Sequence, residues 1–166
     1  MERRQYADFV QMLRECDSTL MKVCFCFTNR RSEDFRDLYQ EIVCTIWQSW
    51  STFRGESSRK TWVTRIALNV AGQEVRRRKR MPQFVQLNEN YYCALAEEAT
   101  EDRNQRLYDL IDRLESSEDR KLLFLYLDHV HLKDIADIMG GSEASVKQKI
   151  YRLKQLLNHL AQDNDE

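Results

Sequence analysis

The segment 134–150 reads DIADIMGGSEASVKQKI and predicts two helices joined by a tight turn. Ala136 precedes Gly140 by four positions and Val146 by ten. Alanine lets two helices approach closely, glycine adopts the left-handed turn conformation, and Val146 closes the small core between the helices. Ser142 has a side chain suited to capping the second helix. This spacing predicts a helix-turn-helix whose second helix presents its outward side chains to a DNA major groove.

Length and composition predict an all-α protein. The 166 residues include four glycines and one proline, and apolar residues show little strand-like alternation. A chain of this length forms one medium domain or two small ones. We expect two small helical domains, residues 1–82 and 103–162, joined by a flexible acidic linker over residues 83–102.

Charge is distributed in blocks, although the formal net charge is only −1. Residues 54–80 carry nine Lys or Arg and two acids, a net charge of +7. Residues 81–119 carry three Lys or Arg and ten acids, a net charge of −7. Residues 120–162 carry seven Lys or Arg and four acids, a net charge of +3. This pattern indicates two basic surfaces joined by an acidic connector.

The sequence argues against membrane, metal and enzymatic roles. It has no apolar run of membrane-spanning length and does not begin with a signal-peptide pattern, so we expect a cytoplasmic protein without membrane insertion. Its five cysteines are typical of buried free thiols in a reducing compartment, and Cys24 and Cys26 have no further ligands at metal-binding spacing. The three histidines accompany no nucleophile. We therefore expect no enzyme activity, metal, cofactor or small-molecule substrate.

Three amphipathic helices are predicted in the N-terminal half. Apolar spacing from Phe9 to Phe27 predicts the first helix. Ser32 is positioned to cap the second, Ser58 to cap the third, and Pro82 to end the third. The predicted buried stripe of the second helix consists of Phe35, Leu38, Tyr39, Ile42, Val43, Ile46, Trp47 and Trp50.

The opposite side of the second helix is polar. Asp37, Gln40, Glu41 and Cys44 lie at positions i, i+3, i+4 and i+7, which places them side by side. In an arbitrary amphipathic helix such a face is simply solvated. Here a further ordered set of motifs accompanies it: Trp47, Phe53-Arg54-Gly55, Thr61-Trp62-Val63, Ile66-Ala67-Leu68-Asn69 and the run Arg76–Arg80.

Together with residues 37–41, this set resembles region 2 of bacterial sigma factors, and of the small extracytoplasmic-function (ECF) group in particular. The C-terminal helix-turn-helix resembles region 4 of the same family, in the right order along the chain. The resemblance covers about residues 10–80 and 105–160. It implies a promoter-recognition subunit that binds the beta and beta-prime subunits of core RNA polymerase, melts the −10 element and binds the −35 element. It also implies control by a cognate anti-sigma factor.

The resemblance assigns polymerase binding to the second helix. Asp37, Leu38, Gln40 and Glu41 match the family motif that docks on the coiled coil of the beta-prime subunit. Carboxylates and an amide suit arginines of a partner helix, with Leu38 expected as an apolar anchor.

The −10 element is assigned to the loop and the third helix. Phe53, Arg54 and Gly55 match the loop that captures an unstacked base, and an aromatic ring with an arginine suits single-stranded DNA. The alternative is a connecting loop with Phe53 packed into the core. On the third helix we expect one face to follow the opening duplex: Thr61, Arg65, Asn69, Arg76 and Arg80.

The −35 element is assigned to the last helix. Its groove-facing candidates are Ser145, Lys147, Gln148, Lys149 and Arg152. Gln148 suits an adenine edge, and Lys149 or Arg152 suits guanine or phosphate. Many family members have serine-arginine where this chain has Gln148-Lys149, and an apolar residue at the position of Gly141, so the −35 sequence stays open.

Two other classes of protein share parts of this pattern. One is a stand-alone helix-turn-helix regulator, which would not carry the motifs at 37–41 and 53–55. The other is a sigma mimic that binds polymerase or an inhibitor without reading promoters.

Overall fold

The computed structural model describes residues 2–28, 32–80 and 110–162, and every regular element in these ranges is helical. The chain divides into two compact units, Met1–Tyr92 and Cys93–Glu166. This confirms the prediction of an all-α protein with two small helical domains. The domain boundaries predicted at residues 82, 83, 102 and 103 lie outside the described ranges, as does Pro82.

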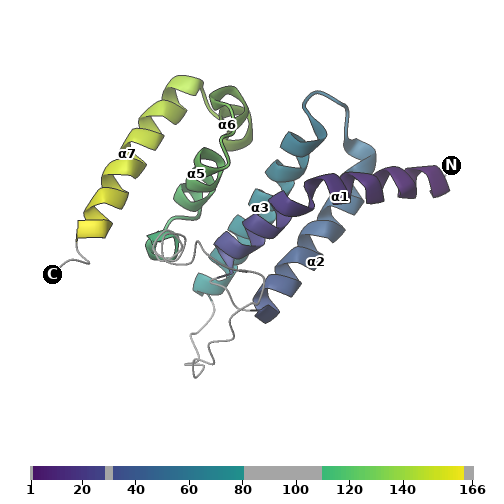
Figure 1. Cartoon of the computed structure of the whole chain (residues 1–166), viewed down its shortest axis with the longest axis horizontal. Helices are drawn as coiled ribbons and strands as arrows, with labels where there is room; N and C mark the ends of the chain where they lie inside the picture. The colour runs from purple at the N-terminus through teal and green to yellow at the C-terminus, as the bar shows by residue number, and fades with distance from the viewer. Residues whose placement is uncertain (1, 29–31, 81–109, 163–166) are drawn as a thin grey trace, which may run out of the picture. The chain divides into compact units, whose positions relative to one another are not determined.

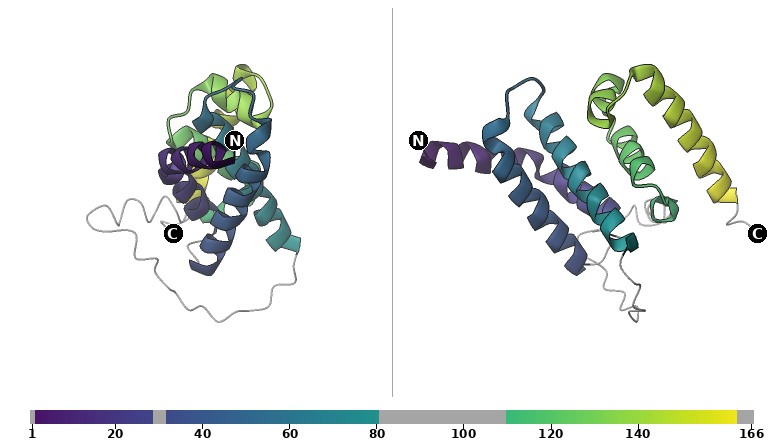
Figure 2. Two further views of the ribbon diagram at one scale, coloured as in Figure 1. Left: turned by 90° about the vertical axis from the view of Figure 1, so that its right-hand side faces the viewer. Right: turned by 180° about the vertical axis from the view of Figure 1, so that it is seen from behind.

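Unit 1 is built from three long helices, α1 (Glu2–Phe27), α2 (Ser32–Ser49) and α3 (Arg59–Arg80), and a short 3₁₀ turn, η1 (Trp50–Thr52), follows α2. Each long helix packs against the other two, and α2 and α3 lie side by side in opposite directions (Figures 1 and 2). Their apolar stripes form one core, which includes Met12, Leu20, Val23, Phe27, Leu38, Ile42, Ile46, Val63, Ala67, Leu68 and Ala71.

The predicted stripe of α2 is buried only in part: Leu38, Ile42 and Ile46 are buried, whereas the rings and side chains of Phe35, Tyr39, Val43 and Trp50 are half-buried. In α2, Trp47 was predicted to be buried but is 45% exposed. Trp47 lies near the end of α2, where the ring contacts it makes are with Phe9 and Tyr6 of α1.

Unit 2 contains a helical turn at residues 110–113, then α5 (Ser117–Leu127), α6 (Leu132–Met139) and α7 (Glu143–Gln162). Arg120 is 7% exposed, and its guanidinium donates to the carbonyl oxygens of Leu114 and Asp112 at 2.8 and 2.9 Å. Lys121 is also buried and pairs with Glu118 at 2.9 Å. These two cations therefore serve the interior of the unit, and the exposed basic surface lies elsewhere.

The helix-turn-helix spans α6 and α7 with the geometry that its spacing predicts. Gly140 has φ = +71°, and its N–H donates to the Ala136 carbonyl at 2.9 Å. A Cβ added at Gly140 would meet no atom within 4 Å, so this backbone conformation, rather than lack of space, requires glycine. Ala136 and Val146 are buried between the helices.

Serine caps fix where two functional helices begin. The Ser58 side chain accepts a hydrogen bond from the Thr61 N–H at 3.0 Å at the start of α3. The Ser142 side chain accepts from the Ser145 N–H at 3.2 Å at the start of α7. Both caps were predicted from the sequence, and each satisfies a backbone N–H that would otherwise have no partner in the first turn. The side chain of Ser32 lies outside the described part of the chain.

The cysteines divide between core and surface. Cys16 and Cys24 are buried, Cys26 is half-buried and Cys44 is exposed, whereas Cys93 lies outside the described ranges. Burial raises the pKa of the Cys24 thiol to about 12. Across the part of the chain that the structure describes, His, Cys, Asp and Glu side chains form no group able to hold a metal ion. In the same ranges no helix has the length and hydropathy needed to cross a membrane.

Candidate functional site

The polar face of α2 is open to solvent. Asp37, Gln40, Glu41 and Cys44 are all exposed, as the helical spacing predicts. Leu38 is 1% exposed and belongs to the core of unit 1. The expectation of Leu38 as an apolar anchor for a partner is therefore wrong, because its helical position turns it toward α1 and α3. The motif match identified the segment, and burial separates its binding side chains from its packing side chain.

A hollow of about 220 Å³ adjoins this face between α1 and α2. Its lining consists of Asp17, Met21, Phe35, Arg36, Tyr39 and Gln40. The Tyr39 hydroxyl donates to the Asp17 carboxylate at 2.7 Å, and burial together with this hydrogen bond raises the pKa of Tyr39 to about 12. Because Leu38 is buried, the apolar surface next to the acidic face comes instead from Met21, Phe35 and Tyr39.

The loop between α2 and α3 is stiffened by stacked rings. Phe53 is half-buried, lies parallel to Trp50 at a centroid distance of 6.5 Å, and meets Trp62 at 5.2 Å. The Phe53 ring therefore packs against its neighbours while part of it stays exposed. This position is intermediate between a ring free to capture a base and a ring packed into the core. Arg54 and Gly55 are exposed, and Gly55 has φ = +74°, which glycine adopts without strain.

The outer face of α3 carries the side chains predicted for the −10 duplex. Asn69, Arg76 and Arg80 are exposed, Arg65 is half-buried, and the half-buried Thr61 hydroxyl lies 2.8 Å from that of Ser58. The helix thus brings all five to one side, with Thr61 engaged in the helix cap.

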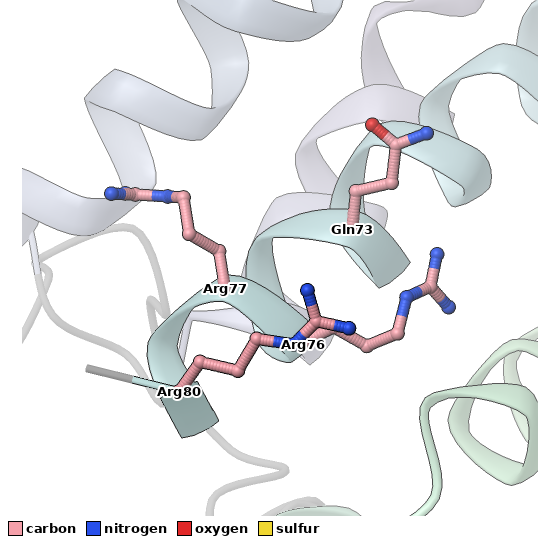
Figure 3. Close-up of a pocket in the computed structure, with 4 residues that line it drawn as sticks. All are labelled: Gln73, Arg76, Arg77 and Arg80. Atoms are coloured by element: carbon pink, nitrogen blue, oxygen red, sulfur yellow. The ribbon is translucent and has the colours of Figure 1, made fainter.

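Beside this face lie two residues that the sequence interpretation did not select, Gln73 and Arg77. With Arg76 and Arg80 they line an open hollow of about 330 Å³ (Figure 3). Figure 3 shows the guanidinium groups of Arg76 and Arg80 extending to one side, whereas Arg77 points the other way. The i, i+3, i+4, i+7 spacing of these four residues is a signal by which all of them could have been found.

A buried carboxylate holds two members of the basic run. Glu74 is 7% exposed and accepts hydrogen bonds from Arg77 Nε and Arg78 Nε, both at 2.7 Å. Arg78 also donates to Asp34 on α2 at 2.7 Å. The hydrogen bond from Arg77, joined by that from Arg78, lowers the pKa of Glu74, although burial acts in the opposite direction. Arg77 and Arg78 therefore tie the end of α3 together and to the start of α2.

The outward face of α7 is basic. Val146, Ile150 and Leu153 are buried, Leu157 and Leu160 are half-buried, and most of the remaining positions are exposed. Of the predicted groove-facing residues, Lys147, Gln148, Lys149 and Arg152 are exposed and Ser145 is half-buried. Tyr151 is 63% exposed and accepts a hydrogen bond from Gln155 at 3.0 Å. A side-chain set of this kind on the second helix of a helix-turn-helix suits the edges and phosphates of duplex DNA.

Comparison with known protein families identifies both units. Residues 12–81 match the family model of Sigma-70 region 2, and residues 104–157 match that of Sigma-70, region 4. The chain belongs to the sigma-70 family, as an ECF sigma factor. It is a sigma subunit that directs transcription initiation, and a stand-alone regulator is not favoured, because such a protein would not carry a region 2 unit.

Named relatives agree with this assignment. The ECF RNA polymerase sigma-E factor of Haemophilus influenzae is 25% identical over 142 residues, which is 78% of this chain and 75% of that protein. The ECF RNA polymerase sigma factor SigX of Bacillus subtilis is 27% identical over 134 residues, 75% of this chain and 69% of that protein. Sigma factors of this family are non-enzymatic initiation factors.

Solved structures show the same fold. The sigma factor RpoE from Bartonella quintana, in complex with the anti-sigma factor NepR, aligns with a TM-score of 0.63 at 19% identity, over 93% of this chain and 97% of that one. CnrH, in complex with the cytosolic domain of CnrY, aligns with a TM-score of 0.67 at 18% identity, over 95% of this chain and 89% of that one.

Proposed function

We propose that this sigma factor binds core RNA polymerase through the acidic face of α2, opens the −10 element with the 53–55 loop and the outer face of α3, and binds the −35 element with α7. The observation that carries the proposal is the separation of charge within unit 1. One helix exposes Asp37 and Glu41, and its neighbour exposes Arg76 and Arg80. A protein partner and a nucleic acid therefore find separate surfaces on one small domain.

The partner of the α2 face is proposed to be the beta-prime coiled coil. Asp37, Gln40 and Glu41 offer two carboxylates and an amide from a rigid helix, which suits charge-assisted hydrogen bonds from arginines. The hollow beside Gln40 offers Met21, Phe35 and Tyr39 to an apolar side chain of the same partner. This combination of apolar and charged groups is typical of the energetically dominant part of a protein interface.

The DNA-binding steps follow from the two basic surfaces. The ring of Phe53 and the side chain of Arg54 would hold an unstacked base and its phosphate, while the arginines of α3 attract the backbone. The family role of α7 is to position the complex on duplex DNA through Lys147, Gln148, Lys149 and Arg152. No bond is made or broken by the protein in this scheme, and it lowers the free energy of strand opening by binding the opened strand.

Control by an anti-sigma factor is part of the proposal. The aligned RpoE structure is a sigma factor bound to the anti-sigma factor NepR, and the fold that it shares with this chain supports a partner of the same class. Because the proposed function requires core polymerase and promoter DNA, the proposal also includes a location in the bacterial cytoplasm.

Reconstitution with core polymerase tests the proposal. The purified chain plus core enzyme should initiate at a discrete promoter, identified by mapping transcript starts after overexpression. Specific operator binding by a dimer of the chain, with no gain from core enzyme, would contradict it.

Charge reversal separates the polymerase interface from the rest. Glu41→Lys should weaken binding to core polymerase by about 10-fold or more, since a hydrogen bond to a charged group contributes about 1.5–3 kcal/mol. Glu15→Lys, an equal change at an exposed position of α1, is the matched control. Loss of folding in Glu41→Lys, or unchanged affinity for polymerase, would remove Glu41 from the interface.

A further inference from the structure

Two large aromatic side chains of unit 1, Tyr6 and Trp47, are exposed. Tyr6, in the early turns of α1, is 60% exposed, and Trp47, near the end of α2, is 45% exposed. Their rings meet edge to face, with centroids 6.2 Å apart and planes at 77°. Exposed tryptophan and tyrosine in contact with one another form a rigid apolar patch, and such patches on soluble proteins mark binding surfaces.

This pair is the outer end of a continuous row of rings. Trp47 contacts Phe9 at 4.7 Å, Phe9 contacts Trp50 at 5.7 Å, and Trp50 stacks on Phe53 at 6.5 Å. Phe9 is 5% exposed, so the row is anchored in the core while its two ends reach solvent. The views in Figures 1 and 2 place the N-terminal part of α1 beside the end of α2 and the loop that follows it. Tyr6 and Trp47 therefore belong to the same end of unit 1 as the proposed base-capturing loop.

Exposed cations adjoin the loop end of this row of rings. Arg54, Arg59 and Lys60 are exposed on the loop and the first turn of α3, and the Arg59 guanidinium lies 6.0 Å from the centre of the Trp50 ring. Exposed rings alternating with cations are the composition of surfaces that follow single-stranded nucleic acid, because each base offers a π-face and each phosphate a negative charge.

We propose that Tyr6 and Trp47 form a second stacking site, for another unstacked base of the DNA strand that the 53–55 loop captures. The inference rests on the proposed function of that loop and extends it along the row of rings. Stacking accepts any base, so the second site holds the opened strand without adding sequence preference.

The test uses the full chain assembled with core polymerase, on a promoter mapped as above and carrying a pre-melted bubble over the −10 element. Tyr6→Ala should weaken bubble binding by about 5-fold or more, since one base–aromatic stack is worth at least that much. Tyr6→Phe keeps the ring and should bind like the unchanged protein. Tyr6 is the position to vary because Trp47 also packs on Phe9, and the thermal unfolding of each variant checks the fold.

Abasic positions placed one at a time along the bubble strand identify the base. At one position, removal of the base should weaken binding by the unchanged holoenzyme and leave binding by Tyr6→Ala unaltered. Equal losses for both proteins at every position, or loss of core polymerase binding in Tyr6→Ala, would overturn the stacking site. If the unchanged holoenzyme recognises no promoter, the proposed function itself fails and the second site with it. If the unchanged holoenzyme recognises its promoter and Tyr6→Ala binds the bubble equally well, only the second site fails.

Discussion

The two basic helices, α3 and α7, differ in what their cationic side chains contact. At the end of α3, Arg77 and Arg78 bond to the buried Glu74, and Arg78 also reaches Asp34. On α7, Lys147, Lys149 and Arg152 are exposed, and none of them forms an ion pair with a carboxylate of the described residues. The basic run of α3 therefore contains two arginines that bond to carboxylates of unit 1, whereas Lys147, Lys149 and Arg152 of α7 are all exposed.

This difference shows that charge counted along a sequence overstates the charge presented to a ligand. Residues 54–80 have a net charge of +7 and residues 120–162 of +3, which would make the first surface much the stronger. In unit 1, two arginines are bonded to carboxylates, and in unit 2, Arg120 and Lys121 are buried. Cations that are bonded to carboxylates or buried contribute less to the charge that a ligand meets than exposed cations do. Substitutions at single positions can distinguish these two groups of cations.

The largest expected effect is on the stability of unit 1. Arg78→Ala removes hydrogen bonds to Glu74 and Asp34 and should lower the free energy of unfolding by about 1–2 kcal/mol, a figure reduced for the partial exposure of Arg78. Arg80→Ala removes an equal charge from an exposed position of the same helix and should leave stability unchanged. All three tryptophans, Trp47, Trp50 and Trp62, lie in unit 1, so tryptophan fluorescence during urea unfolding reports this unit alone. Equal losses in both variants would show that the bonds of Arg78 to carboxylates add no stability.

A substitution at Arg152 tests whether the exposed cations of α7 act in promoter binding. Arg152→Ala should reduce −35-dependent transcription by about 5-fold, since a good side-chain pair with a base is worth about 1–3 kcal/mol. Lys154→Ala is the control, because its ammonium lies 4.6 Å from the Tyr126 ring centre. Transcription by Arg152→Ala at the level of the unchanged protein would remove Arg152 from the interface.

Acid should weaken the Glu74 network. The folded-state pKa of Glu74 lies below its ordinary value of 4.5, so its ionised form stabilises the fold above that pH, and this stability is lost as pH falls through the folded-state value. The unchanged protein should therefore lose more unfolding free energy between about pH 5 and pH 3 than Glu74→Gln. Glu56→Gln, at an exposed loop position, should keep the pH dependence of the unchanged protein, and a Glu74→Gln curve that follows both would show that the network does not depend on charge.

Local rules predicted much of this molecule. Ser58 and Ser142 cap their helices because a cap depends on residues three positions away, and Gly140 takes its left-handed turn because it ends a helix before another begins. The exposed residues of α2 and α7 followed from helical periodicity.

What sequence reasoning missed depends on contacts between distant segments. The family motif includes Leu38 but does not reveal that this side chain is buried in the core of unit 1. Helical periodicity places Trp47 on the inner face of α2 but does not reveal that the ring is partly exposed near the end of the helix. Glu74 had a readable signal in its i+3 and i+4 arginines, yet its bond to the start of α2 through Arg78 joins residues 44 positions apart. The sequence alone does not give these contacts, which show that Arg77 and Arg78 are bonded to carboxylates.

The finest distinction between the two helices lies in the salt dependence of promoter binding. Lys147→Ala should lower the slope of log affinity against log salt by about one, as expected when a single phosphate contact is removed. Arg77→Ala should change the slope less, because the Arg77 guanidinium is held by both oxygens of Glu74 at 2.7 and 2.8 Å. The measurement is promoter binding by holoenzyme across a salt series for both variants. Equal changes in slope would mean that a carboxylate-bound arginine on α3 still reaches the phosphates, and that the two helices present their charge in the same way.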